Sequence, residues 1–211
     1  MPNISRVIYA VTPDLVISEN VAIVGSAGKL KNTEYGELID QFDDVVRFNR
    51  APTEGYEELV GGKTTLRVTN NHVFNNNQED PTKWTKQPRY FIRDLRNTRV
   101  LYIGPDYEPW FNRAQNVHES VDAYLYSYEA GSVLKECVDL KSDKNLTVGM
   151  GFISLCVYSG ITPHLFGFST DPADPRDHYW EDRPPAGPCH DISEEKKVLI
   201  KLASEGRIIL H

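Results

Sequence analysis

The chain has 211 residues, enough for one hydrophobic core but short for two, so we expect residues 1–211 to form a single domain. Hydrophobic residues make up 40% of the chain and charged residues 25%, as in ordinary globular proteins. The net charge of −7 argues against nucleic acid as a partner, because phosphate backbones are bound by clustered Lys and Arg.

The apolar runs of the chain are short. The longest, at 21–24 and 152–157, fall far below the roughly 20 residues that span a bilayer, so no membrane span is expected. Residues 1–20 lack the features of a secretory signal. The cysteines Cys137, Cys156 and Cys189 are odd in number, which favours inert thiols in a reducing compartment. We therefore expect a cytoplasmic or otherwise soluble protein.

Apolar segments of strand length alternate with helical patterns along the chain, which predicts an α/β fold. Strands are predicted at 21–24, 45–48, 90–92, 100–103 and 164–168. A glycine turn and then a helix follow the first strand, with Tyr35, Leu38, Ile39 and Phe42 at the spacing of one buried helix face.

Three further helices are predicted. One covers 53–60 and ends at a glycine pair, and another covers 149–159, with Met150, Ile153 and Val157 on one side. The last covers 191–204, where Asp191 and Glu194 have the spacing of a capping box and Val198, Leu199 and Leu202 are expected to face inward.

Two polar segments are predicted to be loops. Residues 70–87 are rich in asparagine and are interrupted by Pro81. Residues 169–189 contain five prolines among acidic and aromatic residues. A run of this length without regular structure favours a functional lid over a spacer.

The turn Gly25-Ser26-Ala27-Gly28 follows a predicted strand, a place where backbone N–H groups often meet a phosphate. The turn does not complete a P-loop, since Leu30 stands where Ser or Thr should follow the lysine. It also lacks the third glycine of the dinucleotide fingerprint. Taken alone, it is equally consistent with a tight structural turn.

The segments around this turn resemble the large sialylmotif of eukaryotic sialyltransferases. They occur in the family's order, with an intact Arg-x-Asn-x-Ala-Pro-Thr core, at 21–28 (VAIVGSAG), 35–36 (YG), 39–40 (ID), 45–53 (VVRFNRAPT) and 60–65 (VGGKTT). Residues 145–151 (NLTVGMG) through 165–168 (LFGF) are similar to the small sialylmotif. His178-Tyr179-Trp180-Glu181 is similar to the third motif, and His190 with Glu195 to the very small motif.

The resemblance implies a glycosyltransferase that moves an acidic sugar from a CMP-activated donor to a hydroxyl of an acceptor glycan. It also implies a Rossmann-like α/β/α sandwich, a variant of the GT-A fold, as a single catalytic domain over residues 1–211. The two cysteines that join the large and small motifs in secretory relatives are replaced by Val21 and Gly160. The family's membrane anchor and stem are not recognisable in this sequence.

The resemblance assigns the donor contacts to two parts of the chain. Asn49 matches a residue that binds CMP in the family, and its amide can both donate and accept hydrogen bonds. Thr147 and Gly149 begin a predicted helix, where free N–H groups favour the polar atoms of a nucleotide. Gly25 and Ser26 complete the set, although Ser26 stands where the family has an asparagine. Asn49 could instead be a loop cap and Thr147 a plain N-cap.

The resemblance places the catalytic groups on two histidines. His190 is the expected general base, because imidazole titrates near neutral pH and the acceptor hydroxyl must lose a proton as it attacks. Glu195 is expected to hold the His190 ring or its turn in place. His178, supported by Tyr179, is expected to face the departing phosphate. Either histidine could also be a plain surface residue.

No metal or other cofactor is expected, since the sequence contains no Asp-x-Asp run. The spacing of Asp171, Asp174 and Asp177 in a proline-rich segment suits a solvated acidic edge better than a metal site. Three alternatives remain open. The donor could be CMP-Kdo instead of CMP-sialic acid, the protein could be an inactive nucleotide or glycan binder, and the glycine turn alone would allow a nucleotide-dependent oxidoreductase.

Overall fold

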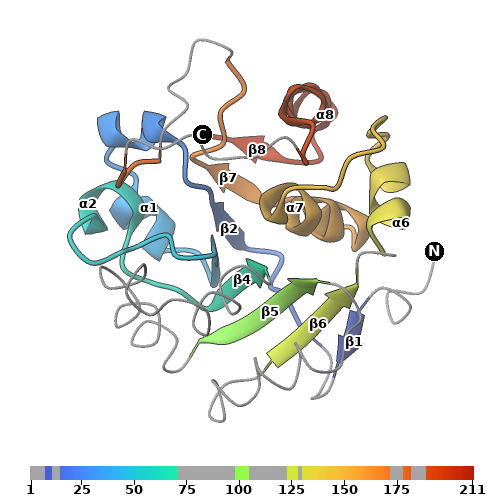
Figure 1. The fold of residues 1–211 in the computed structure, drawn as a ribbon. Coiled ribbons are helices and arrows are strands. Elements are labelled where there is room, and N and C mark those ends of the chain that lie inside the picture. Colours follow the sequence, from blue (N-terminus) through green and yellow to red (C-terminus); the bar gives the residue numbers. More distant parts are fainter. Residues whose placement is uncertain are drawn as a thin grey trace, which may run out of the picture.

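The computed structural model describes residues 8–10, 15–70, 98–104, 123–127, 130–171, 178–181 and 189–211. The strands in these ranges form one eight-stranded sheet in the order β1-β6-β5-β4-β3-β2-β7-β8 (Figure 1). Their bounds are β1 Ile8–Ala10, β2 Val21–Val24, β3 Asp44–Phe48, β4 Leu66–Asn70, β5 Arg99–Gly104, β6 Ala123–Ser127, β7 His164–Phe166 and β8 Ile209–Leu210.

The sheet is parallel except at one edge. Every neighbouring pair from β6 to β8 is parallel, and only β1 pairs in the antiparallel direction. From β2 the chain adds β3, β4, β5 and β6 in one direction and then returns to place β7 on the other side of β2. The order of the strands therefore reverses between β2 and β7, and ligands of open α/β sheets bind at the carboxyl ends of the strands at such a point.

Helices cover both faces of this sheet (Figure 1). Alternate residues of β2 point to opposite sides, so Val21 and Ile23 belong to one core cluster and Ala22 and Val24 to another. The first cluster packs against α7 and α8, and the second against η2, α1 and α2. The helices are η2 Gly28–Asn32, α1 Gly36–Asp40, α2 Glu57–Val60, α6 Ala130–Cys137, α7 Val148–Tyr158 and α8 Ile192–Ser204. The predicted α/β sandwich is confirmed.

The last two helices agree closely with the sequence prediction. Asp191 caps α8 as expected, because its side chain accepts a hydrogen bond of 3.2 Å from the Glu194 N–H. Val198, Leu199 and Leu202 are buried, as predicted. In α7 the predicted inward residues are also buried, but so is every other residue of 150–157, so this helix is enclosed on all sides.

Some predictions about the elements need correction. Leu38 is 39% exposed, so its predicted place in the core is wrong. Helix α1 spans little more than one turn, and Ile39 and Phe42 fill its contact with the sheet. Strands β1, β4, β6 and β8 and helices η2 and α6 were not predicted. The loop predicted at 70–87 is wrong at Asn70, which is the last residue of β4. The rest of that loop, the strand predicted at 90–92 and most of the predicted lid at 169–189 lie outside the described residues.

The cysteines differ in their surroundings. Cys156 is buried in the core cluster around α7, whereas Cys137 is partly buried and Cys189 is exposed. The expectation was of buried or inert thiols. Cys156 is buried, and the inertness of Cys137 and Cys189 stays a prediction. Among the helices that the structure describes, none is long and apolar enough to cross a membrane.

Candidate functional site

The glycine turn after β2 is fixed to the end of β7. Gly25 donates a backbone hydrogen bond of 2.7 Å to the Phe166 carbonyl, and Ala27 donates one of 3.1 Å to the Gly167 carbonyl. A Cβ atom on Gly25 would lie 2.5 Å from the Gly167 oxygen, closer than real contacts allow. Only glycine therefore fits at position 25, and the turn lies at the point where the strand order reverses.

The ring of Phe168 connects this turn to helix α7. A Cβ atom on Gly25 would lie 3.1 Å from Phe168 Cε2, and one on Gly149 would lie 3.1 Å from Phe168 Cε1. The two glycines thus face opposite sides of one aromatic ring. Gly25 and Gly149, more than a hundred residues apart in sequence, are brought together at the carboxyl edge of the sheet.

Thr147 is the N-cap of α7, and its polar groups are all engaged. Its hydroxyl oxygen accepts a bond of 3.0 Å from the Met150 N–H, and its hydroxyl donates a bond of 2.7 Å to Glu195 Oε2. Its own N–H donates a bond of 2.7 Å to Glu195 Oε1. The N–H groups of Val148 and Gly149 come next, in the first turn, where no intrahelical carbonyl is available. N–H groups in the first turn of a helix are donors of the kind that can bind an anion.

Glu195 is a buried carboxyl group, only 7% exposed. Burial raises its pKa from 4.5 to about 7, and the two hydrogen bonds from Thr147 oppose part of this rise. Glu195 was expected to hold the ring of His190 or its turn. Its two carboxylate oxygens instead accept hydrogen bonds from Thr147, and these bonds join α8 to the N-terminus of α7.

Asn49 follows β3 in a left-handed backbone conformation, with φ of 45°. Its N–H donates a bond of 2.9 Å to the Val68 carbonyl, and its Oδ1 accepts a bond of 3.3 Å from the Asn70 N–H. With Oδ1 used in this way, the amide nitrogen is the group that Asn49 can offer to a ligand.

His178 lies beside the glycine turn. It forms an isolated antiparallel bridge with Ala27, and the next residue, Tyr179, donates a backbone bond of 3.1 Å to the Ser26 carbonyl. His178 Nδ1 is 2.9 Å from Glu181 Oε1 and its ring stacks on Trp180 at 4.4 Å. The carboxylate accepts from Nδ1, so Nε2 is the atom left for a substrate.

Tyr179 has a structural place in this arrangement. Its side chain is 2% exposed, and its hydroxyl donates a hydrogen bond to the Pro52 carbonyl. The ring also packs edge-on against Tyr56, at 5.3 Å between centroids. Tyr179 therefore fastens the segment of His178 to the loop that follows Asn49.

His190 precedes α8 and pairs with the segment before α7. Its Nδ1 is 2.9 Å from the Asn145 carbonyl oxygen, and the two residues form an isolated parallel bridge. A carbonyl can only accept a hydrogen bond, so Nδ1 carries the proton of the neutral ring and Nε2 has a free lone pair. This tautomer is the one that a base acting through Nε2 requires.

The supporting contacts of the two histidines were not found from the sequence. Glu181 and Asn145 each fix one imidazole, and Phe168 joins the two glycines. The only sequence signal for these contacts is the acidic residue at the end of the His178–Glu181 run. The carbonyl of Asn145 leaves no signal, because any residue has one.

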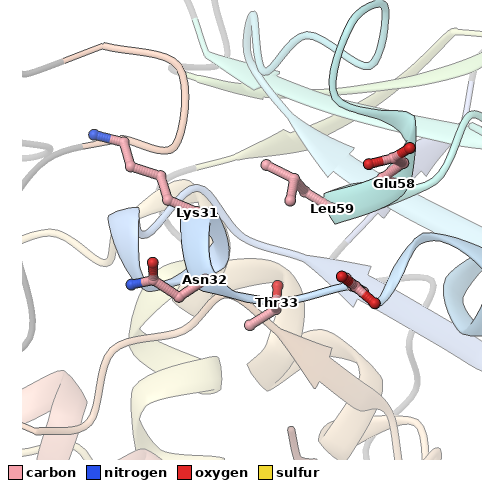
Figure 2. A pocket seen from close by; sticks show the side chains of 6 residues that line it. Lys31, Asn32, Thr33, Glu58 and Leu59 are labelled. Carbon is pink, nitrogen blue, oxygen red and sulfur yellow. The ribbon is translucent and has the colours of Figure 1, made fainter.

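A pocket of about 610 Å³ lies elsewhere, between the end of η2 and α2 (Figure 2). None of the candidate site residues lines it; its walls are Lys31, Asn32, Thr33, Glu34, Glu58 and Leu59. Among the described residues no group of three or more His, Cys, Asp or Glu side chains is placed to hold a metal ion.

Comparisons with a family model and with curated proteins both find sialyltransferases. The model of glycosyltransferase family 29 (sialyltransferase) matches residues 17–108. The chain is 29% identical over 207 residues to beta-galactoside alpha-2,6-sialyltransferase 2 of Xenopus tropicalis, covering 88% of this chain and 39% of that protein. It is 30% identical over 221 residues to CMP-N-acetylneuraminate-beta-galactosamide-alpha-2,3-sialyltransferase 1 of Sus scrofa, covering 92% of this chain and 58% of that one. The chain thus spans less than two thirds of the length of either relative.

The fold has a solved counterpart. The crystal structure of a mammalian sialyltransferase superimposes with a TM-score of 0.65 at 22% identity, covering 90% of this chain and 68% of that one. A second structure, of a mammalian sialyltransferase with Gal-beta-1-3GalNAc-ortho-nitrophenol, superimposes with the same TM-score of 0.65. At this identity the likeness establishes the fold.

Proposed function

We propose that the chain transfers an acidic sugar from a CMP-activated donor to a hydroxyl of an acceptor glycan, because residues 17–108 match glycosyltransferase family 29 and the similar curated proteins are sialyltransferases. The observation that carries this proposal is the meeting of two distant segments, at Gly25 and Gly149, around the ring of Phe168. This is the edge where open α/β sheets bind nucleotides. Residues 1–211 would act as one catalytic unit.

The donor would lie across the carboxyl ends of β2 and β3. The first turn of α7 would supply the N–H groups of Val148 and Gly149, which favour the negative charge of a nucleotide phosphate. The amide nitrogen of Asn49 and the turn at Gly25 and Ser26 would make the remaining polar contacts. Thr147 would contribute chiefly by holding the start of α7, since its hydroxyl and its N–H are already bonded to Glu195.

The transfer would be an inverting displacement. Nε2 of His190 would take the proton of the acceptor hydroxyl, whose oxygen forms the new bond to the anomeric carbon. The bond from that carbon to the phosphate oxygen breaks, and CMP leaves with the bonding electrons. His178, fixed through Nδ1 by Glu181, would act as an imidazolium that carries a second proton on Nε2, and Nε2 would donate to the phosphate as its negative charge increases.

Donor and acceptor specificity are open to direct assay. The named relatives act on beta-galactosides or beta-galactosamides, so a β-galactoside is the first acceptor to test. Calorimetric titration with CMP and UDP would test the nucleotide, and hydrolysis of CMP-sialic acid and CMP-Kdo would test the sugar. We expect CMP to bind much more tightly than UDP. Equal affinity for the two nucleotides would contradict the donor assignment.

A further inference from the structure

Two arginines are buried side by side in the sheet. Arg47 in β3 is 0% exposed and Arg67 in β4 is 1% exposed, and the two residues are register partners on neighbouring strands. They face the side of the sheet that carries α1 and α2, because they alternate with residues of the opposite core cluster. A guanidinium group is buried only where acceptors surround it, so the carbonyls that each arginine binds show what it holds in place.

Arg67 binds the segment that follows β3. Its Nη1 donates a bond of 2.8 Å to the Ala51 carbonyl and one of 3.3 Å to the Asn49 carbonyl. Both acceptors belong to the Arg-x-Asn-x-Ala-Pro-Thr core of the large sialylmotif. One charged group therefore joins two carbonyls on either side of Arg50 and sets the shape of this turn.

The backbone conformation of Asn49 depends on these hydrogen bonds from Arg67. A left-handed backbone is costly for a residue with a side chain and persists where the surroundings impose it. All three groups that hold Asn49 come from β4: the Arg67 guanidinium on its carbonyl, the Val68 carbonyl on its N–H and the Asn70 N–H on its side chain. Strand β4 thus determines the direction of the Asn49 amide.

We propose that Arg67 is a positioning residue for donor binding: its buried guanidinium holds the Asn49–Ala51 turn so that the Asn49 amide faces the nucleotide. The inference rests on the proposed function, since it assumes that Asn49 contacts CMP. Arg67 itself lies beneath the turn and would not touch the donor. Lysine cannot replace it fully, because the ammonium group of its flexible side chain is not held in one orientation as a planar guanidinium is.

Arg47 provides a matched control. It is equally buried, but its Nε and Nη2 donate to the end of α2 and the residues after it. Nη2 donates bonds of 2.6 Å to the Val60 carbonyl and 3.0 Å to the Gly61 carbonyl, and Nε donates one of 3.1 Å to the Lys63 carbonyl. None of these acceptors lies in the Asn49–Ala51 turn. Arg47→Lys and Arg67→Lys should therefore have similar costs for the fold and different effects on the nucleotide.

The experiment compares CMP binding by wild type, Arg67→Lys and Arg47→Lys, after thermal unfolding has confirmed that each variant is folded. We expect Arg67→Lys to weaken CMP binding roughly tenfold, with a similar rise in the donor KM and a kcat within about twofold of wild type. Arg47→Lys should bind CMP like wild type. Unchanged CMP affinity in folded Arg67→Lys, or an equal loss in both variants, would overturn the inference.

Further measurements decide the role of Arg67 if the Arg67→Lys variant does not fold. If Arg67→Lys does not fold, the neutral Arg67→Gln replaces it, with Arg47→Gln as its control and the same expected difference. If neither folds, the guanidinium NMR signals of wild type are followed during CMP titration. A shift of the Arg67 signal with the Arg47 signal unchanged supports the inference, and the absence of that difference overturns it. If wild type itself fails to bind CMP, the proposed function falls instead.

Discussion

The carboxylate of Glu195 receives two hydrogen bonds from one residue, Thr147, each of 2.7 Å. This pair joins the first turn of α8 to the N-cap of α7. A second link runs beside it, between His190 and the Asn145 carbonyl. The segments 145–147 and 190–195 therefore lie together, and the proposed base is attached to the helix that would bind the donor.

Glu195 should make stability depend on pH. Its pKa rises from 4.5 to about 7 on folding, so the folded state binds the proton more tightly than the unfolded state. The stability that Glu195 contributes is fully present below pH 4.5 and is lost as the pH rises to about 7. Glu195→Gln stays neutral and keeps an acceptor and a donor for Thr147. We expect the variant to gain on the order of 1–3 kcal/mol over wild type between these limits.

Urea unfolding of wild type and Glu195→Gln from pH 4.5 to 8 measures this difference. Glu194→Gln, at the neighbouring position, is the control and should follow wild type, because the Glu194 side chain pairs with Lys197 on the outside of α8. Parallel stability curves for wild type and Glu195→Gln would show that Glu195 does not titrate as its burial implies.

His190→Ala should reduce sugar transfer by roughly 100-fold or more, the usual scale for losing a general base. CMP affinity should barely change, because the nucleotide contacts belong to other residues. Transfer to a β-galactoside and calorimetry with CMP measure the two effects, with His211→Ala as a control imidazole at the end of β8. A folded His190→Ala protein with near wild-type transfer would move the search for the base to His178.

Asn49→Gly should weaken CMP binding without straining the backbone, since glycine adopts the left-handed conformation freely. The chain offers a matched control at Asp139, which also has a positive φ, of 56° against 45° for Asn49. Asp139→Gly changes the backbone in the same way, at the end of α6. Calorimetry should show a loss of roughly tenfold for Asn49→Gly and none for Asp139→Gly. Equal affinities would exclude Asn49 from the donor site.

Gly25→Ala should destabilise the fold by roughly 3 kcal/mol or more, because the new Cβ meets a backbone oxygen that has no room to move. That Cβ would lie 2.5 Å from the Gly167 oxygen. Gly62→Ala is the control, since its Cβ would meet nothing closer than 3.9 Å. Thermal unfolding of both variants checks this, and a Gly25→Ala protein as stable as Gly62→Ala would contradict the described contact between the β2 and β7 ends.

Transfer should survive EDTA, as expected from a sequence without an Asp-x-Asp run. The measurement is turnover with and without the chelator, followed by added manganese. Turnover that is lost with EDTA and restored by manganese would mean that a metal site exists and was missed.

A helix or strand can be predicted from the sequence where the side chains of that segment form a recognisable pattern. Strand β2 is uniformly apolar and was placed correctly, and α7 was placed within one residue at either end. Strand β4 was missed because only Leu66 and Val68 of its five residues are apolar, and Arg67 is one of its three polar residues. A buried charge looks like a surface residue in sequence, and the carbonyls that accept from Arg67 belong to another segment.

The residues of the site were likewise predictable only where their own side chains match a motif. Motif resemblance pointed to Asn49, His178 and His190, and the structure gives each of them a defined hydrogen-bond partner. The bonds between Thr147 and Glu195 could not be foreseen, because they join residues 48 positions apart. Backbone acceptors, such as the Asn145 carbonyl, cannot be identified from residue type at all.

The insertion of β7 beside β2 affects how the chain can be made. Strand β2 finds β3 early, but its other side is completed only by β7, at His164–Phe166. A ribosome-bound chain that ends before β7 therefore exposes the open edge of an apolar strand, which invites pairing with other chains. Production of this protein should benefit from slow synthesis or from chaperones that cover β2 until residue 166 emerges.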